Sequence, residues 1–199
     1  MSSLYHEQQL SALCGVHALN NLMQGPVCGA GDLAPIAHQL DEAERALLDP
    51  SDVAAAGTAS HRIDVNTGDF SLEVLAMWAL ETHGVSLINA DHASVAEGVA
   101  STPDTEEGFL VHRSSHWFAL RRVASLWWNL DSKLRRPLLL ANDDLGEVIR
   151  RLRVDGHTLH VVRCATPLPL PQGDVVGGAG REAVYHPIDY LLSYPSLDP

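Results

Sequence analysis

The chain has 199 residues, which is enough for one domain with a full core and too few for two domains of ordinary size. Its balance of 46% apolar and 19% charged residues is typical of a globular protein, and no apolar run approaches the ~20 residues that a membrane-spanning helix needs. The net charge of −12 is uneven, because residues 1–110 carry sixteen acids against only Arg45 and Arg62. This acidity argues against nucleic-acid binding and suits a partner with a basic surface, unless the acids only keep the surface soluble.

The first part of the chain has the spacing of helices. Apolar residues from Leu13 onward recur every three or four positions and stop before Gly25-Pro26, which predicts a first helix. A second helix is predicted from about Leu33 to Leu48, with Asp32 as its N-cap. Residues 49–68 lack periodicity and are predicted to form an exposed loop.

A third helix is predicted over 71–83, because Gly84 offers a stop, and the pattern then changes to strands. Ala124-Ser125 is a tight link that predicts an antiparallel hairpin, and another helix is predicted over 143–153. Helices followed by a small antiparallel sheet indicate the α+β class. The predicted strands are 85–88, 108–113, 116–123, 126–130 and 158–163.

The last part of the chain differs in composition from the rest. Residues 167–199 carry six prolines and four glycines, which predicts a tail after a folded domain of residues 1–166. Within this tail, residues 185–194 are apolar enough to dock on the domain, at a place that the sequence does not indicate.

The cysteines indicate the compartment. Cys14, Cys28 and Cys164 make an odd number without a repeated spacing, so we expect no disulfide framework and a reducing environment. No basic flank followed by an apolar stretch opens the chain, which speaks against a signal peptide. We therefore expect a cytoplasmic or nuclear protein.

Cys14 is the candidate nucleophile, because it stands where a helix begins, and a helix N-terminus is one place where a thiol becomes a thiolate at neutral pH. The ordinary alternative is a small buried hydrophobic residue, which is the commoner fate of a lone cysteine. Gln9, or Gln8 beside it, precedes Cys14 at a spacing that lets its amide donate to an oxyanion together with the backbone N–H of Cys14.

His116 is the candidate general base, because it opens a strand after the turn-like Ser114-Ser115. The partner strand of the predicted hairpin carries Asn129 and Asp131 on one face, and either side chain can orient the imidazole. The alternative for Asp131 is a turn residue at the end of a strand.

No cofactor and no metal are expected. His17 follows Cys14 by three positions, but the sequence has no second Cys-x-x-Cys or His-Glu-x-x-His to complete a zinc site. His17 is expected to pack or cap along the first helix.

These residues together resemble the Josephin family of deubiquitinating cysteine proteases. The matching segments occur in the right order over most of residues 1–164: Tyr5-His6-Glu7-x-Gln9, Leu13-Cys14-x-x-His17-x-Leu19-Asn20-Asn21-Leu22-x-Gln24, Ile36-Ala37-His38-Gln39-Leu40-Asp41-Glu42, His116-Trp117-Phe118-Ala119-Leu120-Arg121 and Trp128-Asn129-Leu130-Asp131-Ser132-Lys133-Leu134.

The resemblance implies a papain-like α+β fold and a thiol protease that hydrolyses isopeptide or peptide bonds at the C-terminal glycine of ubiquitin. By motif, Cys14 is the nucleophile, His116 the general base and Gln9 the oxyanion donor, and the third member maps onto Asp131 rather than Asn129. The implied partner is ubiquitin or a ubiquitin conjugate, bound by a monomer that needs neither a membrane nor nucleic acid.

Two other functions stay open at this point. The chain can be a catalytically weak or silent ubiquitin-binding module of the same fold, although Cys14, His116 and Asp131 are all present. It can also be a papain-like hydrolase or transferase that acts on another acyl group, which a panel of substrates would separate.

Overall fold

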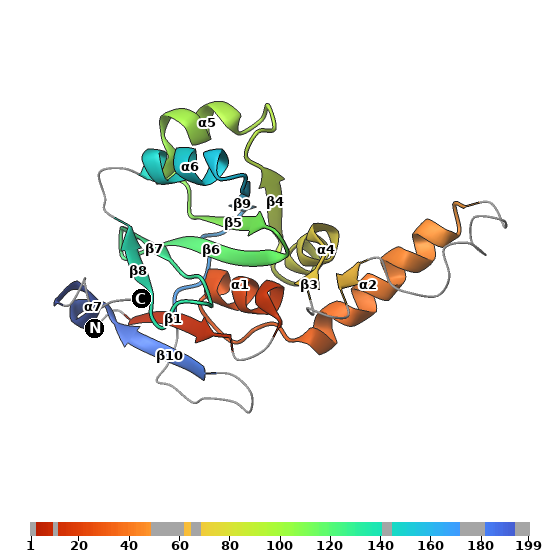
Figure 1. Ribbon diagram of the computed structural model, residues 1–199, viewed down its shortest axis with the longest axis horizontal. Coiled ribbons are helices and arrows are strands. Elements are labelled where there is room, and N and C mark those ends of the chain that lie inside the picture. The colour runs from red at the N-terminus through yellow and green to blue at the C-terminus, as the bar shows by residue number, and fades with distance from the viewer. Residues whose placement is uncertain are drawn as a thin grey trace.

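The computed structural model describes residues 3–9, 12–48, 62–64, 69–140, 145–171 and 182–193 (Figure 1). Its helices are α1 (Cys14–Met23), α2 (Ala30–Arg45), α4 (Leu72–His83), α5 (Ala96–Ser101), α6 (Leu145–Val154) and α7 (Ile188–Ser193), with a short 3-10 helix η1 (Pro103–Thr105). Its strands are β1 (Ser3–Gln8), β2 (Ile63–Asp64), β3 (Asp69–Phe70), β4 (Val85–Asn89), β5 (Gly108–Arg113), β6 (His116–Val123), β7 (Leu126–Asn129), β8 (Leu138–Leu140), β9 (Thr158–Cys164) and β10 (Glu182–Pro187).

An antiparallel six-stranded sheet forms the centre of the described chain, with the strand order β4-β9-β5-β6-β7-β8. The predicted hairpin is confirmed, because β6 and β7 pair with Val123 opposite Leu126 across the two-residue turn. Ala124 and Ser125 in this turn both have positive φ, 52° and 63°, as a tight turn that follows the twist of its strands requires. The predicted α+β class is confirmed.

Helices cover both faces of this sheet, and β6 shows how the sequence encodes that. Its side chains alternate, so Trp117 and Ala119 join the core on the α1 side, whereas Phe118 and Leu120 join the core beneath α5 and α6. A strand that is buried on both faces does not alternate between apolar and polar residues. This explains the nearly continuous apolar run after His116. In Figure 1, α1 lies below β6, and α5 and α6 lie above the sheet.

The helix that begins at Cys14 runs through the core, and all ten residues of α1 are buried. It approaches the sheet closely at Gly108 of β5, where an added Cβ would lie 2.8 Å from Leu22 Cδ1 and 3.1 Å from the Leu120 carbonyl oxygen. The absence of a side chain at Gly108 therefore sets the distance between helix and sheet. This distance also affects how far Cys14, the predicted nucleophile on the helix, lies from His116, the predicted base on the sheet.

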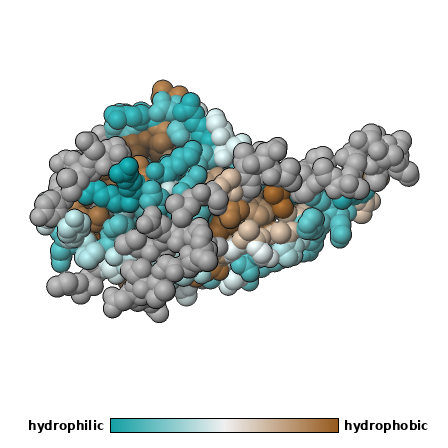
Figure 2. Space-filling model, turned by 60° about the horizontal axis from the view of Figure 1, so that its bottom comes forward, coloured by the Kyte–Doolittle hydropathy of each residue, from teal (hydrophilic) through white to brown (hydrophobic). Residues whose placement is uncertain are grey.

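The second helix begins earlier than its apolar pattern predicts. It starts at Ala30 rather than near Leu33, and its N-cap is Gly29 rather than Asp32. Asp32 occupies the third helical position, where its carboxylate accepts the N–H of Gly29 at 2.7 Å. The helix projects from the body as an arm (Figure 1), and Figure 2 shows an apolar area near the base of this arm.

The end of the chain returns to its beginning. Strand β10 pairs with β1 in antiparallel register, and Tyr185 lies opposite Tyr5. Ile188 and Leu191 of α7 are buried in the main core, so the apolar segment near the C-terminus docks beside β1. Pairing over such a sequence distance leaves no local signal, which is why the docking place could not be predicted. The division of the chain at residue 166 stays a prediction.

The remaining predicted elements are confirmed with small shifts at their ends, namely helix α4 and strands β4, β5, β6, β7 and β9. The helix predicted over 143–153 corresponds to α6, which begins at Leu145. The described elements without a counterpart among the predicted helices and strands are α5, η1, α7, β1, β2, β3, β8 and β10. The loop predicted over 49–68 lies largely outside the described residues. Among the described helices, none combines the length and the apolar character needed to cross a bilayer.

Candidate active site

Cys14 is the first residue of α1 and is buried, with 5% of its surface exposed. Burial raises the pKa of its thiol to about 11, because a thiolate loses solvation there. The backbone N–H groups of Trp117 and Gly15 act in the opposite direction, whereas the carboxylate of Asp69 raises the pKa further. The thiol is therefore protonated at neutral pH in this conformation, in contrast to the activation expected from its position at a helix N-terminus.

The sulfur of Cys14 lies 3.6 Å from Asp69 Oδ1 and 3.6 Å from the carbonyl oxygen of Ser115. Both distances are within the range of a hydrogen bond from sulfur. Among the described residues, the thiol makes no such bond to His116. It does contact the residue directly before His116, so helix α1 and strand β6 meet at the predicted nucleophile and base.

His116 and Asp131 lie in direct contact, with 2.8 Å between His116 Nε2 and Asp131 Oδ1. The two elements of the contact are the start of β6 and the turn after β7. Burial alone would raise the pKa of Asp131, but the hydrogen bond from His116 and the backbone N–H of Lys133 lower it below its ordinary value. Asp131 is therefore a carboxylate at neutral pH, able to hold an N–H at Nε2 and leave Nδ1 of His116 as the basic nitrogen.

Asn129, the other candidate for the third member, has a different partner. Its Oδ1 accepts the backbone N–H of Asp131 at 3.0 Å and so shapes the turn that presents this carboxylate. The sequence left Asn129 and Asp131 open, and the structure pairs the imidazole with Asp131. Asp131 also accepts the backbone N–H of Lys133, so it combines this contact with the turn role that was its ordinary alternative.

Gln9 follows β1 and is held by Ser132, the residue after Asp131. Its backbone N–H donates to the Ser132 carbonyl at 2.8 Å, and its Oε1 accepts from Ser132 Oγ at 2.8 Å. The NH2 group is the donor that an oxyanion would need, and the hydrogen bond from Ser132 to the oxygen fixes the orientation of the amide. Thus Gln9 contacts the neighbour of Asp131, just as Cys14 contacts the neighbour of His116.

A buried polar network around Glu7 joins β1, α1 and the loop before Asp131. Glu7 Oε2 lies 2.7 Å from His17 Nδ1, and its carboxylate also accepts from Tyr5 and Asn20. Burial would raise the pKa of Glu7, but these hydrogen bonds outweigh it and lower that pKa. Asn21 adds the link to the sheet, since its Nδ2 donates to the Leu130 carbonyl at 2.8 Å. The network explains why these polar residues follow Cys14 inside the core.

His17 was expected to pack or cap along the first helix, and it is buried in the core with its Nδ1 2.7 Å from Glu7 of β1. In the part of the chain that the structure describes, no group of three or more histidine, cysteine, aspartate or glutamate side chains is arranged to hold a metal ion.

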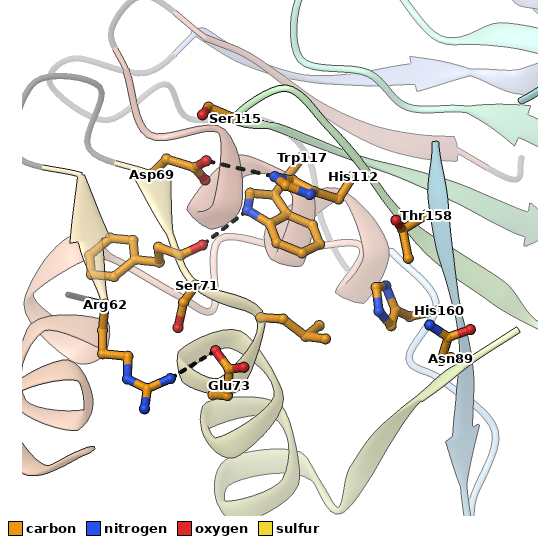
Figure 3. Close-up of a pocket in the computed structure, with 12 residues that line it drawn as sticks. Arg62, Asp69, Ser71, Glu73, Asn89, His112, Ser115, Trp117, Thr158 and His160 are labelled. Carbon is orange, nitrogen blue, oxygen red and sulfur yellow. Dashed lines mark hydrogen bonds and ion pairs between the residues drawn. The ribbon is translucent and has the colours of Figure 1, made fainter. Parts of the chain in front are cut away.

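A cleft of about 510 Å³ adjoins this region (Figure 3). Its lining includes Asp69 and Ser115, which the Cys14 thiol contacts, and also His112 and Trp117. The four predicted site residues, Gln9, Cys14, His116 and Asp131, are not among the residues that line it. The imidazole of His112 stacks on the indole of Trp117 with 4.1 Å between ring centroids, and its Nε2 lies 3.9 Å from Asp69 Oδ2. The cleft therefore offers a bound group a carboxylate and an aromatic surface.

The sequence predictions did not include Asp69, Ser132 or His112 as site residues. Ser132 had one usable signal, its position directly after Asp131, whereas Asp69 precedes a predicted helix and has none. The contact between Asp69 and Cys14 spans 55 positions in the chain, so only the fold reveals it.

Comparisons with known proteins point to one family. The model of the Josephin family matches residues 9–163, which contain all four predicted site residues. Human ataxin-3 is 32% identical over 173 residues, covering 84% of this chain and 47% of ataxin-3. The human ataxin-3-like protein is 33% identical, covering 84% of this chain and 48% of that protein. An ataxin-3 homolog from Arabidopsis thaliana is 33% identical, covering 84% of this chain and 61% of the homolog.

The chain thus spans about half the length of the curated relatives that it matches. The family match itself covers well over half of this chain, from Gln9 to Arg163. The chain belongs to the Josephin family.

Proposed function

We propose that this chain is a cysteine deubiquitinase, which hydrolyses isopeptide or peptide bonds at the C-terminal glycine of ubiquitin. Membership of the Josephin family supports the reaction class. The observation that carries the proposal is the 2.8 Å contact between His116 and Asp131, one residue from the carbonyl that Cys14 approaches. A nucleophile, a base and a group that orients the base are the parts that acyl transfer to a thiol needs.

In the first half of the reaction, Nδ1 of His116 accepts the proton of the Cys14 thiol, while Asp131 holds the N–H at Nε2. The thiolate attacks the carbonyl carbon of the terminal glycine, and the carbonyl oxygen of this glycine gains the negative charge. The amide NH2 of Gln9 and the backbone N–H of Cys14 donate to this oxyanion. The C–N bond then breaks, and the imidazolium returns the proton to the leaving amine.

In the second half, a water molecule attacks the thioester. Nδ1 of His116 accepts a proton from this water, the C–S bond breaks and the thiolate leaves. Asp131 stabilises the imidazolium in both halves, because its carboxylate faces the protonated ring. The products are a free ubiquitin carboxylate, an amine and the regenerated enzyme.

The proposal is tested by the hydrolysis of a fluorogenic amide at the C-terminus of ubiquitin. We expect the unmodified chain to release the fluorophore and Cys14→Ala to release none. The matched control is Cys28→Ala, since Cys28 is also a buried cysteine but hydrogen bonds to Asn20 through its backbone, which the change preserves. Hydrolysis that survives Cys14→Ala, or that Cys28→Ala abolishes instead, would overturn the assignment.

A second function has one specific observation in its favour. The thiol of Cys14 contacts Asp69, and burial raises its pKa to about 11, so the thiol is a poor nucleophile in this conformation. Ubiquitin binding by calorimetry, together with no turnover of the fluorogenic amide under any condition, would favour a silent ubiquitin-binding module over the enzyme.

A further inference from the structure

Asp69 occupies a position between the proposed nucleophile and the cleft. One carboxylate oxygen lies 3.6 Å from Cys14 Sγ, and the other lies 3.9 Å from His112 Nε2. The side chain of Asp69 is only 10% exposed, so water screens it weakly. Figure 3 shows this carboxylate turned toward His112 at the edge of the cleft that Ser115 also lines.

The strand that carries Asp69 is fixed on the side of the catalytic sheet. The indole Nε1 of Trp117 donates to the carbonyl oxygen of Phe70 at 3.0 Å, and Trp117 directly follows His116. If β3 moves away from Cys14, this hydrogen bond must break or Trp117 must move with the strand. The bond therefore links the strand of Asp69 to β6, the strand of the proposed general base.

The same strand is fixed on the side of the arm. Ile63 of β2 pairs with Phe70 of β3, and the backbone N–H of Ser71 donates to the Arg62 carbonyl at 2.8 Å. The guanidinium of Arg62 lies 2.9 Å from Glu44 of α2 and 3.2 Å from Glu73 of α4. The position of Asp69 therefore depends on helix α2 as well as on β6.

The contact between Asp69 and Cys14 favours one protonation state of the thiol. Only the protonated thiol can donate to a carboxylate, whereas a thiolate at this distance would face a like charge with little solvent between the two. The other titratable groups nearby are His112, which faces the far oxygen of Asp69, and His116, which the thiol does not contact among the described residues. Asp69 thus favours the form of Cys14 that cannot attack.

We propose that Asp69 of strand β3 is a positioning residue that holds Cys14 as a protonated thiol. The enzyme becomes reactive when β3 moves, the contact between Asp69 and Cys14 is released, and the thiol turns to His116. This proposal rests on the proposed role of Cys14 as the nucleophile.

The test measures the reactivity of Cys14 without ubiquitin. Iodoacetamide alkylates thiolates, and digestion with mass spectrometry gives the rate at Cys14 separately from Cys28 and Cys164. In Asp69→Asn the acceptor oxygen is kept and the charge is removed. We expect the midpoint of the rate–pH profile at Cys14 to fall by about one pH unit or more, which makes alkylation near neutral pH about tenfold faster.

Asp155→Asn is the matched control, because it removes the same charge at an exposed position after α6 and should leave the Cys14 profile unchanged. Asp69→Ser is the second variant, and a thermal melt confirms that each chain is folded. An unchanged midpoint in a folded Asp69 variant, or a midpoint that moves upward, would overturn the proposal. Because the assay uses no ubiquitin, a chain that fails to cleave ubiquitin can still confirm or refute the role of Asp69.

Discussion

Asp131 and His116 form the contact on which the proposed chemistry depends most directly. We expect His116→Ala to lower the turnover of a ubiquitin amide by roughly 100- to 10,000-fold, the usual contribution of a positioned general base. Asp131→Asn should cost less, because an amide oxygen can still accept from Nε2 but carries no charge to stabilise the imidazolium. Steady-state kinetics of both variants checks the order, and an Asp131→Asn enzyme slower than His116→Ala would contradict it.

Ser132 should act through Gln9 rather than by itself. Ser132→Ala removes the 2.8 Å hydrogen bond that fixes the amide of Gln9, so we expect kcat to fall several-fold with little change in KM. Gln9→Ala removes the donor itself and should lower kcat by on the order of 100-fold. Comparing kcat and KM for the two variants checks this relation. A Ser132→Ala enzyme with unchanged kcat would mean that Gln9 needs no such support.

The site residues differ in how far the sequence could predict them. Cys14, His116 and Asp131 carry local signals, since each stands at the start of a helix, the start of a strand or the end of a hairpin. Asp69 carries no such signal, because its role depends on a contact between β3 and α1. The pKa of Cys14 was likewise beyond prediction, since it depends on burial, and the helix N-terminus alone suggested the opposite direction.

The fit between helix α1 and strand β5 gives a stability prediction. Gly108→Ala would place a Cβ 2.8 Å from Leu22 Cδ1 and 3.1 Å from a backbone oxygen, so we expect the free energy of unfolding to fall by about 1–3 kcal/mol. The matched control is Gly31→Ala in α2, where an added Cβ meets nothing within 4 Å. This change should be neutral or stabilise by up to about 1 kcal/mol. Urea denaturation of both variants measures the difference, and equal effects would show that the approach is not tight.

The β1–β10 pair predicts how stability depends on pH. Burial, with smaller effects from His6 and Arg136, lowers the pKa of His186 to about 4. The unfolded chain therefore takes up a proton at this histidine as the pH falls below about 6.5, while the folded chain resists it until about pH 4. Stability should consequently decrease as the pH falls through this window.

His186→Gln should flatten that decrease, because glutamine has no proton to bind there. His6 should leave a residual slope of the same sign, since burial lowers its pKa as well. Thermal melts of both chains near pH 7 and pH 5 provide the measurement. An identical loss of melting temperature in the two chains would show that His186 does not contribute.

Elements with a local pattern could be predicted, and elements that depend on distant partners could not. The hairpin at Ala124-Ser125 and helix α4 before Gly84 followed from turn and stop residues. Strand β10 is recognisable only through its pairing with β1. The start of α2 was placed too late, since Ala30 and Gly31 carry no large apolar side chain and the cap is made by a glycine.

In the molecule as a whole, the candidate site lies where helix α1 and strand β1 meet the six-stranded sheet. Helix α1 and the end of β1 supply Cys14 and Gln9, whereas the sheet supplies His116 and Asp131. The buried Glu7 network and the pair formed by Gln9 and Ser132 hold these parts together. The sequence indicated both parts, but it gave no measure of their alignment, which the packing of buried polar groups sets.

The proposed attack of Cys14 on the C-terminal glycine of ubiquitin is tested most directly with ubiquitin that carries an electrophile in place of that glycine. The reaction is followed by intact-mass measurement and peptide mapping. We predict one covalent adduct, located on Cys14 rather than on Cys28 or Cys164, and no adduct with Cys14→Ala. No adduct with the unmodified chain, or an adduct that persists in Cys14→Ala, would contradict the claim.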